Sequence, residues 1–248
     1  MFSERIAKVA AALQGSGNDF LFVTPGADLT YLTGYRALPL ERLTCLAIRQ
    51  DGRAWMIVPT LEHPSAVAHN VQSHGIDLLA WNETENPYTK FADAIGKVSN
   101  PLVNNLMWVE KAWHLQSAVG KNVQLADSVL SDIREIKSAQ EIAALHEAGA
   151  AIDVVHEQMH KWLKPGRTER EVSRDIADAI LDAGHETVDF VIVGSGPNGA
   201  SPHHEVSDRV INEREPVVID IGGSMPSGYC SDSTRMYVIG QPPKKYAE

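Results

Sequence analysis

The first half of the chain alternates helix-like and strand-like hydrophobic patterns. Apolar residues recur at helical spacing near the start, and short runs of consecutive apolar residues follow. Runs of this length are typical of strands, and Asp51-Gly52 between two of them predicts a tight hairpin turn. The expected elements are a helix around 6–13, strands at 21–23, 44–48 and 54–58, a helix at 64–74, a strand at 78–81 and a helix at 88–98.

The second half begins with two helix starts. Ser138 precedes Glu141 by three residues, and Thr168 precedes Glu171 by the same spacing. In such a capping box each side chain bonds an exposed backbone N–H of the other residue. Apolar residues three or four apart follow both boxes, which predicts two amphipathic helices, the second ending at Gly184. Strands are expected after it at 188–193, 216–221 and 233–239, and the domain boundary near 125–137.

Two aspartates in the stretch PVVIDIGGSMPSGYCSDSTRMYVIG are candidates for metal binding. Asp220 lies within an apolar run, where a lone ionised carboxylate is costly to bury without cations or donors nearby. Asp232 follows a Gly-rich turn, and a hairpin would bring both carboxylates together from neighbouring strands. Two like charges at close range favour a shared divalent cation or a shared proton. Oxygen ligands suit ions such as Mn²⁺, and paired metals occur in aminopeptidases. A turn residue bonded to its own backbone is the alternative, and it is stronger for Asp232 than for Asp220.

Two further motifs precede these aspartates. The segment GSGPNG at Gly194–Gly199 has the spacing of a dinucleotide-binding loop, but that site requires a helix directly after the glycines. Pro197, Pro202 and the lack of helical periodicity argue against such a helix. His203 and His204 come next. Adjacent side chains of an extended segment point to opposite sides, so at most one of them would face a given site. A solvated loop histidine is the alternative interpretation of either residue.

Composition and charge narrow the classes of function. The 248 residues are 44% hydrophobic and 22% charged, which is enough apolar material for folded cores. The net charge of -10, without any Lys/Arg cluster, argues against nucleic acid or an anionic membrane as partner. Cys45 and Cys230 lie far apart and form no disulfide or zinc pattern. The amphipathic start is unlike a signal peptide and no long apolar run follows, so a cytoplasmic protein is expected.

Taken in order, the motifs resemble one protein family. GSGPNGASPHHEVSDR, VVIDIGG and GYCSDSTR are similar to the first half of the pita-bread catalytic domain of aminopeptidase P and prolidase. IREIKSAQEIAALHEA resembles the start of that domain, and YLTGY with ERL, DGR and VPTLE resembles the N-terminal domain of these enzymes. The implied fold class is α/β (α+β). A creatinase/prolidase-type N-terminal α/β domain at residues 1–130 would precede the first half of a pita-bread domain at 131–248.

The resemblance also implies a reaction and roles for individual residues. Asp220 would chelate one metal, Asp232 would bridge two, and His203 would be the catalytic, substrate-binding histidine. The implied cofactors are two divalent metal ions, with Mn expected and Co or Zn as alternatives. The implied substrates are short Xaa-Pro peptides, cleaved by a metal-bound hydroxide, and the implied assembly is a homodimer. Thr234 and Arg235 are expected to support Asp232 from the adjoining positions.

The sequence departs from the family pattern in its number of metal ligands. The family uses two Asp, one His and two Glu, and only the two Asp have counterparts here. We therefore expect a truncated chain that is weakly active or inactive alone. The alternatives are a non-catalytic relative that binds peptides, a creatine-type amidinohydrolase and a dinucleotide-dependent enzyme. The intact Asp220, Asp232 and His203 argue against the binding module, which has no need of a metal pair.

Overall fold

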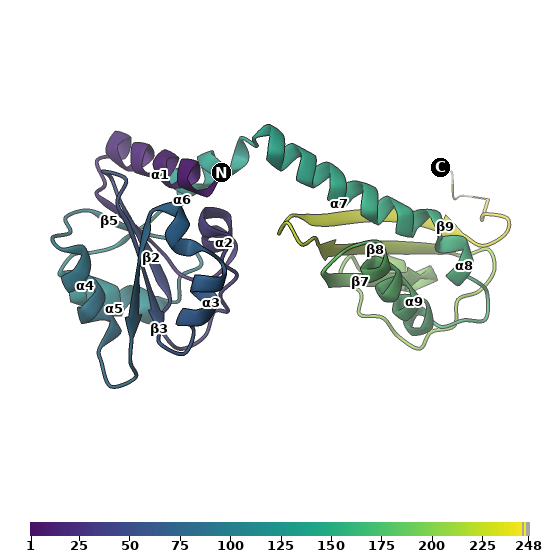
Figure 1. Cartoon of the computed structure of the whole chain (residues 1–248). Coiled ribbons are helices and arrows are strands. Elements are labelled where there is room, and N and C mark those ends of the chain that lie inside the picture. Colours follow the sequence, from purple (N-terminus) through teal and green to yellow (C-terminus); the bar gives the residue numbers. More distant parts are fainter. Residues whose placement is uncertain (245, 247–248) are drawn as a thin grey trace. The chain divides into compact units, whose positions relative to one another are not determined.

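The computed structural model describes residues 1–244 and residue 246 (Figure 1). The chain folds into two compact units, Met1–Ile136 and Lys137–Glu248. The boundary expected after residue 130 falls within helix α6, Asp127–Glu135, which belongs to the first unit. No helix in this described part of the chain combines the length and apolar character needed to cross a membrane.

A six-stranded mixed sheet forms the centre of the first unit, in the order β4-β3-β2-β1-β5-β6. Strands β1 to β3 pair antiparallel, and the pairs β3–β4, β1–β5 and β5–β6 are parallel. The hairpin predicted at Asp51-Gly52 joins β2 to β3 and is confirmed. The strands are β1 (Phe20–Val23), β2 (Cys45–Arg49), β3 (Ala54–Pro59), β4 (Ile76–Trp81), β5 (Pro101–Val103) and β6 (Gln124–Leu125).

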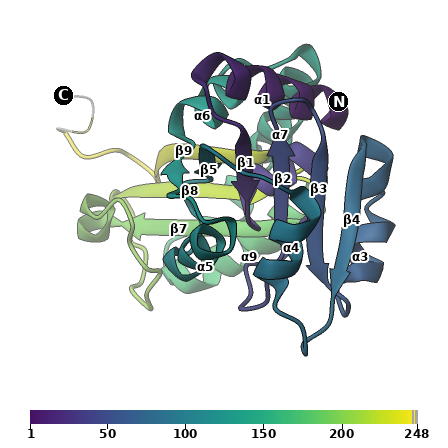
Figure 2. The same ribbon diagram turned by 90° about the vertical axis from the view of Figure 1, so that its left-hand side faces the viewer.

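Helices cover both faces of this sheet. The four residues of β1 are fully buried because their side chains alternate between two cores. Leu21 and Val23 pack with helices α1, α2, α3 and α6, whereas Phe20 and Phe22 pack with α4 and α5, which lie in front of the strands in Figure 2. These helices are α1 (Phe2–Ser16), α2 (Ala27–Thr33), α3 (His63–Ala68), α4 (Pro87–Ile95) and α5 (Val109–Val119), besides α6.

The second unit is a three-stranded antiparallel sheet with helices on one face (Figure 1). Its strands are β7 (Thr187–Ser195), β8 (Pro216–Ser224) and β9 (Cys230–Val238), in that order. Helix α9 (Glu169–Asp182) packs on β7, and helix α7 (Ala139–Glu157) packs on β9, followed by α8 (Met159–Trp162). Both predicted capping boxes form, at Ser138 and at Thr168. The three predicted strands are also confirmed.

The sequence patterns missed several short elements. Helix α2 has only seven residues, and β5 and β6 have three and two, too few to show a period. The helix expected at 64–74 is two pieces, α3 and the 3-10 turn η1 (Val71–His74), because Asn70 between them has a left-handed φ of 53°. The long helix expected after Ser138 is likewise divided at Gln158 into α7 and α8.

Substitutions at two glycines of the second unit are expected to change the stability of the fold in opposite directions. A Cβ at Gly222 would lie 2.4 Å from the Ser231 carbonyl oxygen and 2.6 Å from the Phe190 ring, whereas a Cβ at Gly149 in α7 would meet nothing within 4 Å. We expect Gly222→Ala to lower the free energy of unfolding by about 1–3 kcal/mol through overpacking. Gly149→Ala should raise it by about 0.5–1 kcal/mol, since a helical alanine loses less backbone entropy. Urea unfolding of both variants measures this, and an unchanged stability of Gly222→Ala would contradict the packing.

Candidate functional site

The candidate site is the face of the β7-β8-β9 sheet that lies away from the helices. Asp220 pairs with Thr234, and Gly222 pairs with Asp232. Directly opposed residues of an antiparallel pair share a face, as do residues two apart on one strand. Asp220, Thr234 and Asp232 therefore lie on one face. The alternate positions of β8 point the other way, into the core beneath α7 and α9: Val217, Ile219 and Ile221.

Apolar side chains surround the two carboxylates. By the same register, Phe190 and Ile192 of β7 share their face, opposite Gly222 and Asp220 respectively. The Phe190 ring occupies the space that a Cβ at Gly222 would need. Met236 of β9 also lies on this face, and 54% of its surface is exposed. The described structure thus presents an apolar sheet face that carries two acidic groups.

Thr234 fixes the orientation of Asp220. Its hydroxyl Oγ1 donates to Asp220 Oδ1 at 2.6 Å, and the Asp220 side chain is half-buried. Asp232 is exposed, and neither carboxylate forms an ion pair with any residue of 1–244. Arg235 faces the helices instead, with its guanidinium 3.5 Å from Asp153 of α7. Of the two residues expected to support Asp232, Thr234 therefore supports Asp220, and Arg235 lies on the opposite face.

The chemistry of the two aspartates can be compared with that of a metal site. Two carboxylates without cationic partners, presented from adjacent strands on one face, are the oxygen donors that hard divalent ions prefer. Within the described residues, no group of three or more His, Cys, Asp or Glu side chains is placed to hold a metal. The pair thus fits a divalent ion by ligand type, and further donors are needed to complete its coordination.

The GSGPNG segment folds back onto this same face. It forms the short 3-10 turn η2, Gly196–Ala200. A Cβ at Gly199 would lie 3.1 Å from the Gly194 carbonyl oxygen and 3.2 Å from the side chain of Val218, which precedes Asp220 by two residues. The glycines therefore allow close backbone packing against the sheet. Between these glycines and Lys244 the structure has no α-helix, so the dinucleotide-binding hypothesis lacks the helix N-terminus that it requires.

The two adjacent histidines have different environments. The His204 ring is mostly buried, and its Nε2 lies 2.8 Å from Glu169 Oε2. His203 is exposed and has no hydrogen bond to another residue of the described chain. The segment is a turn and not the extended stretch expected from the sequence, since the His204 N–H donates to the Ser201 carbonyl at 3.2 Å. His203 lies within this turn with its ring exposed, and His204 follows it with its ring held inside.

Glu169 is a buried carboxylate that the sequence patterns missed. Its side chain has no exposed surface and accepts hydrogen bonds from the backbone and hydroxyl of Ser195, from Asn198 and from Ser207 at 2.7–3.3 Å, besides His204. In the sequence it is indistinguishable from an ordinary acidic residue in the first turn of a helix, where the helix dipole favours it. The groups that donate hydrogen bonds to it lie 26 to 38 positions later in the chain.

These donors control the ionisation of Glu169. Burial alone would raise the pKa of a carboxyl group, because it disfavours the charged form. The hydrogen bonds from the Ser195 N–H, the Ser207 hydroxyl and the His204 ring outweigh burial and lower the pKa of Glu169 to about 2. The group is therefore a charged carboxylate throughout the neutral range.

Two buried histidines hold strand β9 from the helix side. His185 Nε2 lies 2.8 Å from Ser231 Oγ, and His156 Nε2 lies 3.2 Å from the Ser233 carbonyl oxygen. These contacts flank Asp232 on both sides along the strand. His156 Nδ1 also lies 2.8 Å from the Tyr237 hydroxyl, and burial lowers the pKa of His156, which favours its neutral form.

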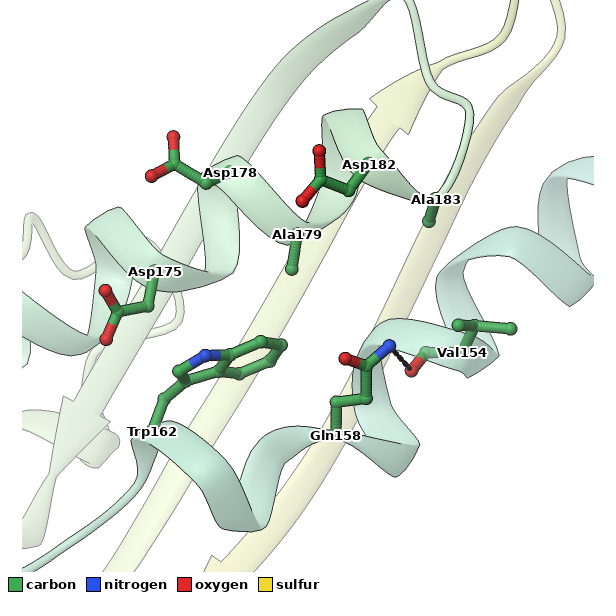
Figure 3. Close-up of a pocket in the computed structure, with 8 residues that line it drawn as sticks. All are labelled: Val154, Gln158, Trp162, Asp175, Asp178, Ala179, Asp182 and Ala183. Carbon is green, nitrogen blue, oxygen red and sulfur yellow. Dashed lines mark hydrogen bonds between the residues drawn. The ribbon is translucent and has the colours of Figure 1, made fainter.

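A groove of about 260 Å³ lies on the other side of the sheet, among the helices (Figure 3). The Trp162 ring of α8 lies below α9, whose carboxylates Asp175, Asp178 and Asp182 line the groove. Because it is on the helix side, the groove is separate from the face that carries Asp220 and Asp232.

Comparison with known proteins identifies relatives for both units. The model of metallopeptidase family M24 matches residues 143–248, and that of the creatinase/prolidase N-terminal domain matches residues 5–136. The probable dipeptidase PepE of Mycobacterium tuberculosis (strain ATCC 25618 / H37Rv) is 42% identical over 251 residues, which cover 100% of this chain and 66% of that protein. The chain thus spans about two thirds of the length of this curated relative.

Solved structures agree with this match. Dipeptidase PepE from Mycobacterium ulcerans is 43% identical and superimposes with a TM-score of 0.93, covering 99% of this chain and 67% of its own. A prolidase from Thermococcus sibiricus is 32% identical, with a TM-score of 0.88 over 100% of this chain and 68% of its own.

The low pKa of Glu169 predicts a pH-dependent stability. Its folded pKa of about 2 lies below the ordinary value of 4.5, so the charged form stabilises the fold above pH 4.5 and this stabilisation is lost as the pH falls toward 2. Linkage gives about 3 kcal/mol for the full effect. We expect the urea midpoint of the wild type to fall more steeply than that of Glu169→Gln across this window. Glu171→Gln, which changes an exposed carboxylate of the same helix, should follow the wild type. Parallel curves for all three proteins would contradict the assignment.

Proposed function

Because the chain belongs to metallopeptidase family M24 and carries a creatinase/prolidase N-terminal domain, we propose that it contributes to a metal-dependent hydrolase of Xaa-Pro bonds in short peptides. The observation that supports this most is the pair Asp220 and Asp232 on one sheet face, without cationic partners among the described residues. The names of these relatives, dipeptidase and prolidase, agree with this class of reaction.

In this proposal Asp220 and Asp232 hold divalent metal, with Mn²⁺ preferred and Co²⁺ or Zn²⁺ as alternatives. When bound there, the metal would lower the pKa of a water molecule and would polarise the scissile carbonyl. Thr234 holds one oxygen of Asp220 at 2.6 Å, which leaves the carboxylate with a fixed orientation. Further donors are needed beside the pair, because the described residues place no third His, Cys, Asp or Glu side chain with it.

In this proposal, the side chains around Asp220 and Asp232 bind the peptide. His203 is exposed in the loop that packs against the aspartate face, where its ring can donate to a peptide carbonyl and stabilise negative charge that develops on it. Phe190 and Met236 supply apolar surface on the same face for a proline ring or a neighbouring side chain. The expectations of a homodimer and of a cytoplasmic location stay predictions.

A second candidate is a non-catalytic relative that binds peptides. The absence of a third metal donor among residues 1–244 and 246 favours it, because two carboxylates alone hold a divalent ion weakly. The two carboxylates argue the other way, since a peptide-binding surface has no need of two adjacent acidic groups without cationic partners among the described residues.

Substitution of the aspartates tests the proposal. We expect Asp220→Asn and Asp232→Asn to weaken Mn²⁺ binding by about 100-fold or more and to abolish Xaa-Pro hydrolysis, because each removes an anionic ligand. Calorimetric titration with Mn²⁺ and a dipeptide assay, on the product of the gene read to its natural stop codon, measure both effects. Asp182→Asn makes the same change on the helix side and should leave both unaltered.

The outcomes separate the two candidates. Metal binding and hydrolysis that survive in both aspartate variants would contradict the roles given to these residues. A wild type that binds neither Mn²⁺ nor any substitute ion, yet binds proline-containing peptides, would establish the non-catalytic alternative.

A further inference from the structure

We propose that Glu169 is a positioning residue for His203: it fixes the loop from Ser195 to Ser207 so that His204 points inward and His203 outward. The inference deepens the proposed peptidase function and rests on it for the role of His203. Glu169 belongs to helix α9, and its hydrogen-bond partners do not include Asp220 or Asp232.

The carboxylate closes the loop by joining its beginning, middle and end. Ser195, at the end of β7, donates both its N–H and its hydroxyl to Oε1 at 2.8 and 2.7 Å. Asn198 of η2 donates its side-chain amide at 3.1 Å. Ser207 donates its hydroxyl to Oε2 at 2.7 Å. A single buried acceptor thus determines the path of the chain around His203.

The C-terminal end of the loop is also fixed to the start of α9 through the backbone. The N–H groups of Glu169 and Arg170, which have no partner within the helix, donate to the carbonyls of Arg209 and Ser207 at 3.1 Å each. The segment between Ser201 and Ser207 has fewer backbone hydrogen bonds to the rest of the fold. The side chains of His204 and Ser207 in this segment form hydrogen bonds to another element of the described structure. Both of these bonds are made to Glu169.

Through its hydrogen bond with His204, Glu169 also affects the adjacent residue, His203. His203 lies in a turn that the His204 N–H closes by donating to the Ser201 carbonyl at 3.2 Å. The His204 ring, held inside at the end of this turn, fixes the turn with the His203 ring exposed. If His204 were released, both rings could rotate and exchange environments. Glu169 would then no longer determine which histidine faces a substrate.

A glutamine at this position cannot make the same contacts. Its amide nitrogen would replace one acceptor oxygen by a donor, facing either the donors of Ser195 or those of Ser207 and His204. The negative charge, which Arg209 supports through Ser195 Oγ at 2.6 Å, would also be lost. We therefore expect Glu169→Gln to loosen the loop and to leave the β7-β8-β9 sheet in place.

The first experiment reads the two histidines directly on this chain. Modification by diethyl pyrocarbonate, followed by mass spectrometry of the peptide that contains them, gives the rate for each ring. In the wild type, His203 should react several-fold faster than His204, whose ring is 14% exposed. In Glu169→Gln the two rates should converge, and in the control Glu171→Gln they should stay apart. Protection of His204 that persists in Glu169→Gln would overturn the inference, whatever the activity.

The second experiment asks whether Glu169 acts through His203. In the gene product read to its stop codon, we expect Glu169→Gln and His203→Ala each to lower kcat/KM for an Xaa-Pro dipeptide by about 100-fold. The double variant should lose little more than His203→Ala alone, since Glu169 has nothing to position once the ring is gone. Losses that multiply in the double variant would show a general structural role and overturn the inference.

The two failures are distinguishable. If the wild type shows no Xaa-Pro hydrolysis, the proposed function fails, and the positioning of the histidines is then decided by the modification rates alone. If the wild type hydrolyses the dipeptide but His203→Ala does not affect it, the peptidase assignment stands and the positioning role is overturned.

Discussion

The register of β8 against β9 is the constraint on which the candidate site depends. It sets Asp220 opposite Thr234 and Gly222 opposite Asp232, so both carboxylates emerge on the face away from the helices. A slip by one residue would turn them into the apolar core formed with α7 and α9, where burying two carboxylates is costly. The apolar residues Val217, Ile219 and Ile221 oppose this slip, because it would expose them. Burial on one face of the sheet thus determines the chemistry of the other.

Helix α9 connects the sheet to the loop that carries the histidines. Its apolar side packs on β7, and its first residue, Glu169, enters the loop as a buried anion. The desolvation of that anion is offset by hydrogen bonds from Ser195, Ser207 and His204, which lower its pKa to about 2. A carboxylate stabilised in this way fixes every group that donates to it, so one residue defines the shape of a loop far from it in sequence.

Much of the second unit could be predicted because its signals are local. The capping boxes at Ser138 and Thr168, and the apolar runs of the strands, lie within a few residues and mark element boundaries directly. The hairpin that brings Asp220 and Asp232 together follows from one Gly-rich turn. The first unit was less predictable, since strands such as β5 are set by parallel pairing with distant β1 rather than by their own pattern. The hydrogen bond between Thr234 and Asp220 likewise depends on the register of β8 against β9, which the sequence does not display.

The sequence by itself determined the two-unit α/β organisation, the aspartate pair and the histidine pair, because periodicity, capping and short motifs are properties of neighbouring residues. It also carried the resemblance to the metallopeptidase family that the comparisons confirm. Only the tertiary structure decided which histidine faces outward, which face of the sheet bears the carboxylates free of cationic partners, and that Glu169 organises the loop. Those outcomes depend on hydrogen bonds and packing between residues tens of positions apart, which no local pattern specifies.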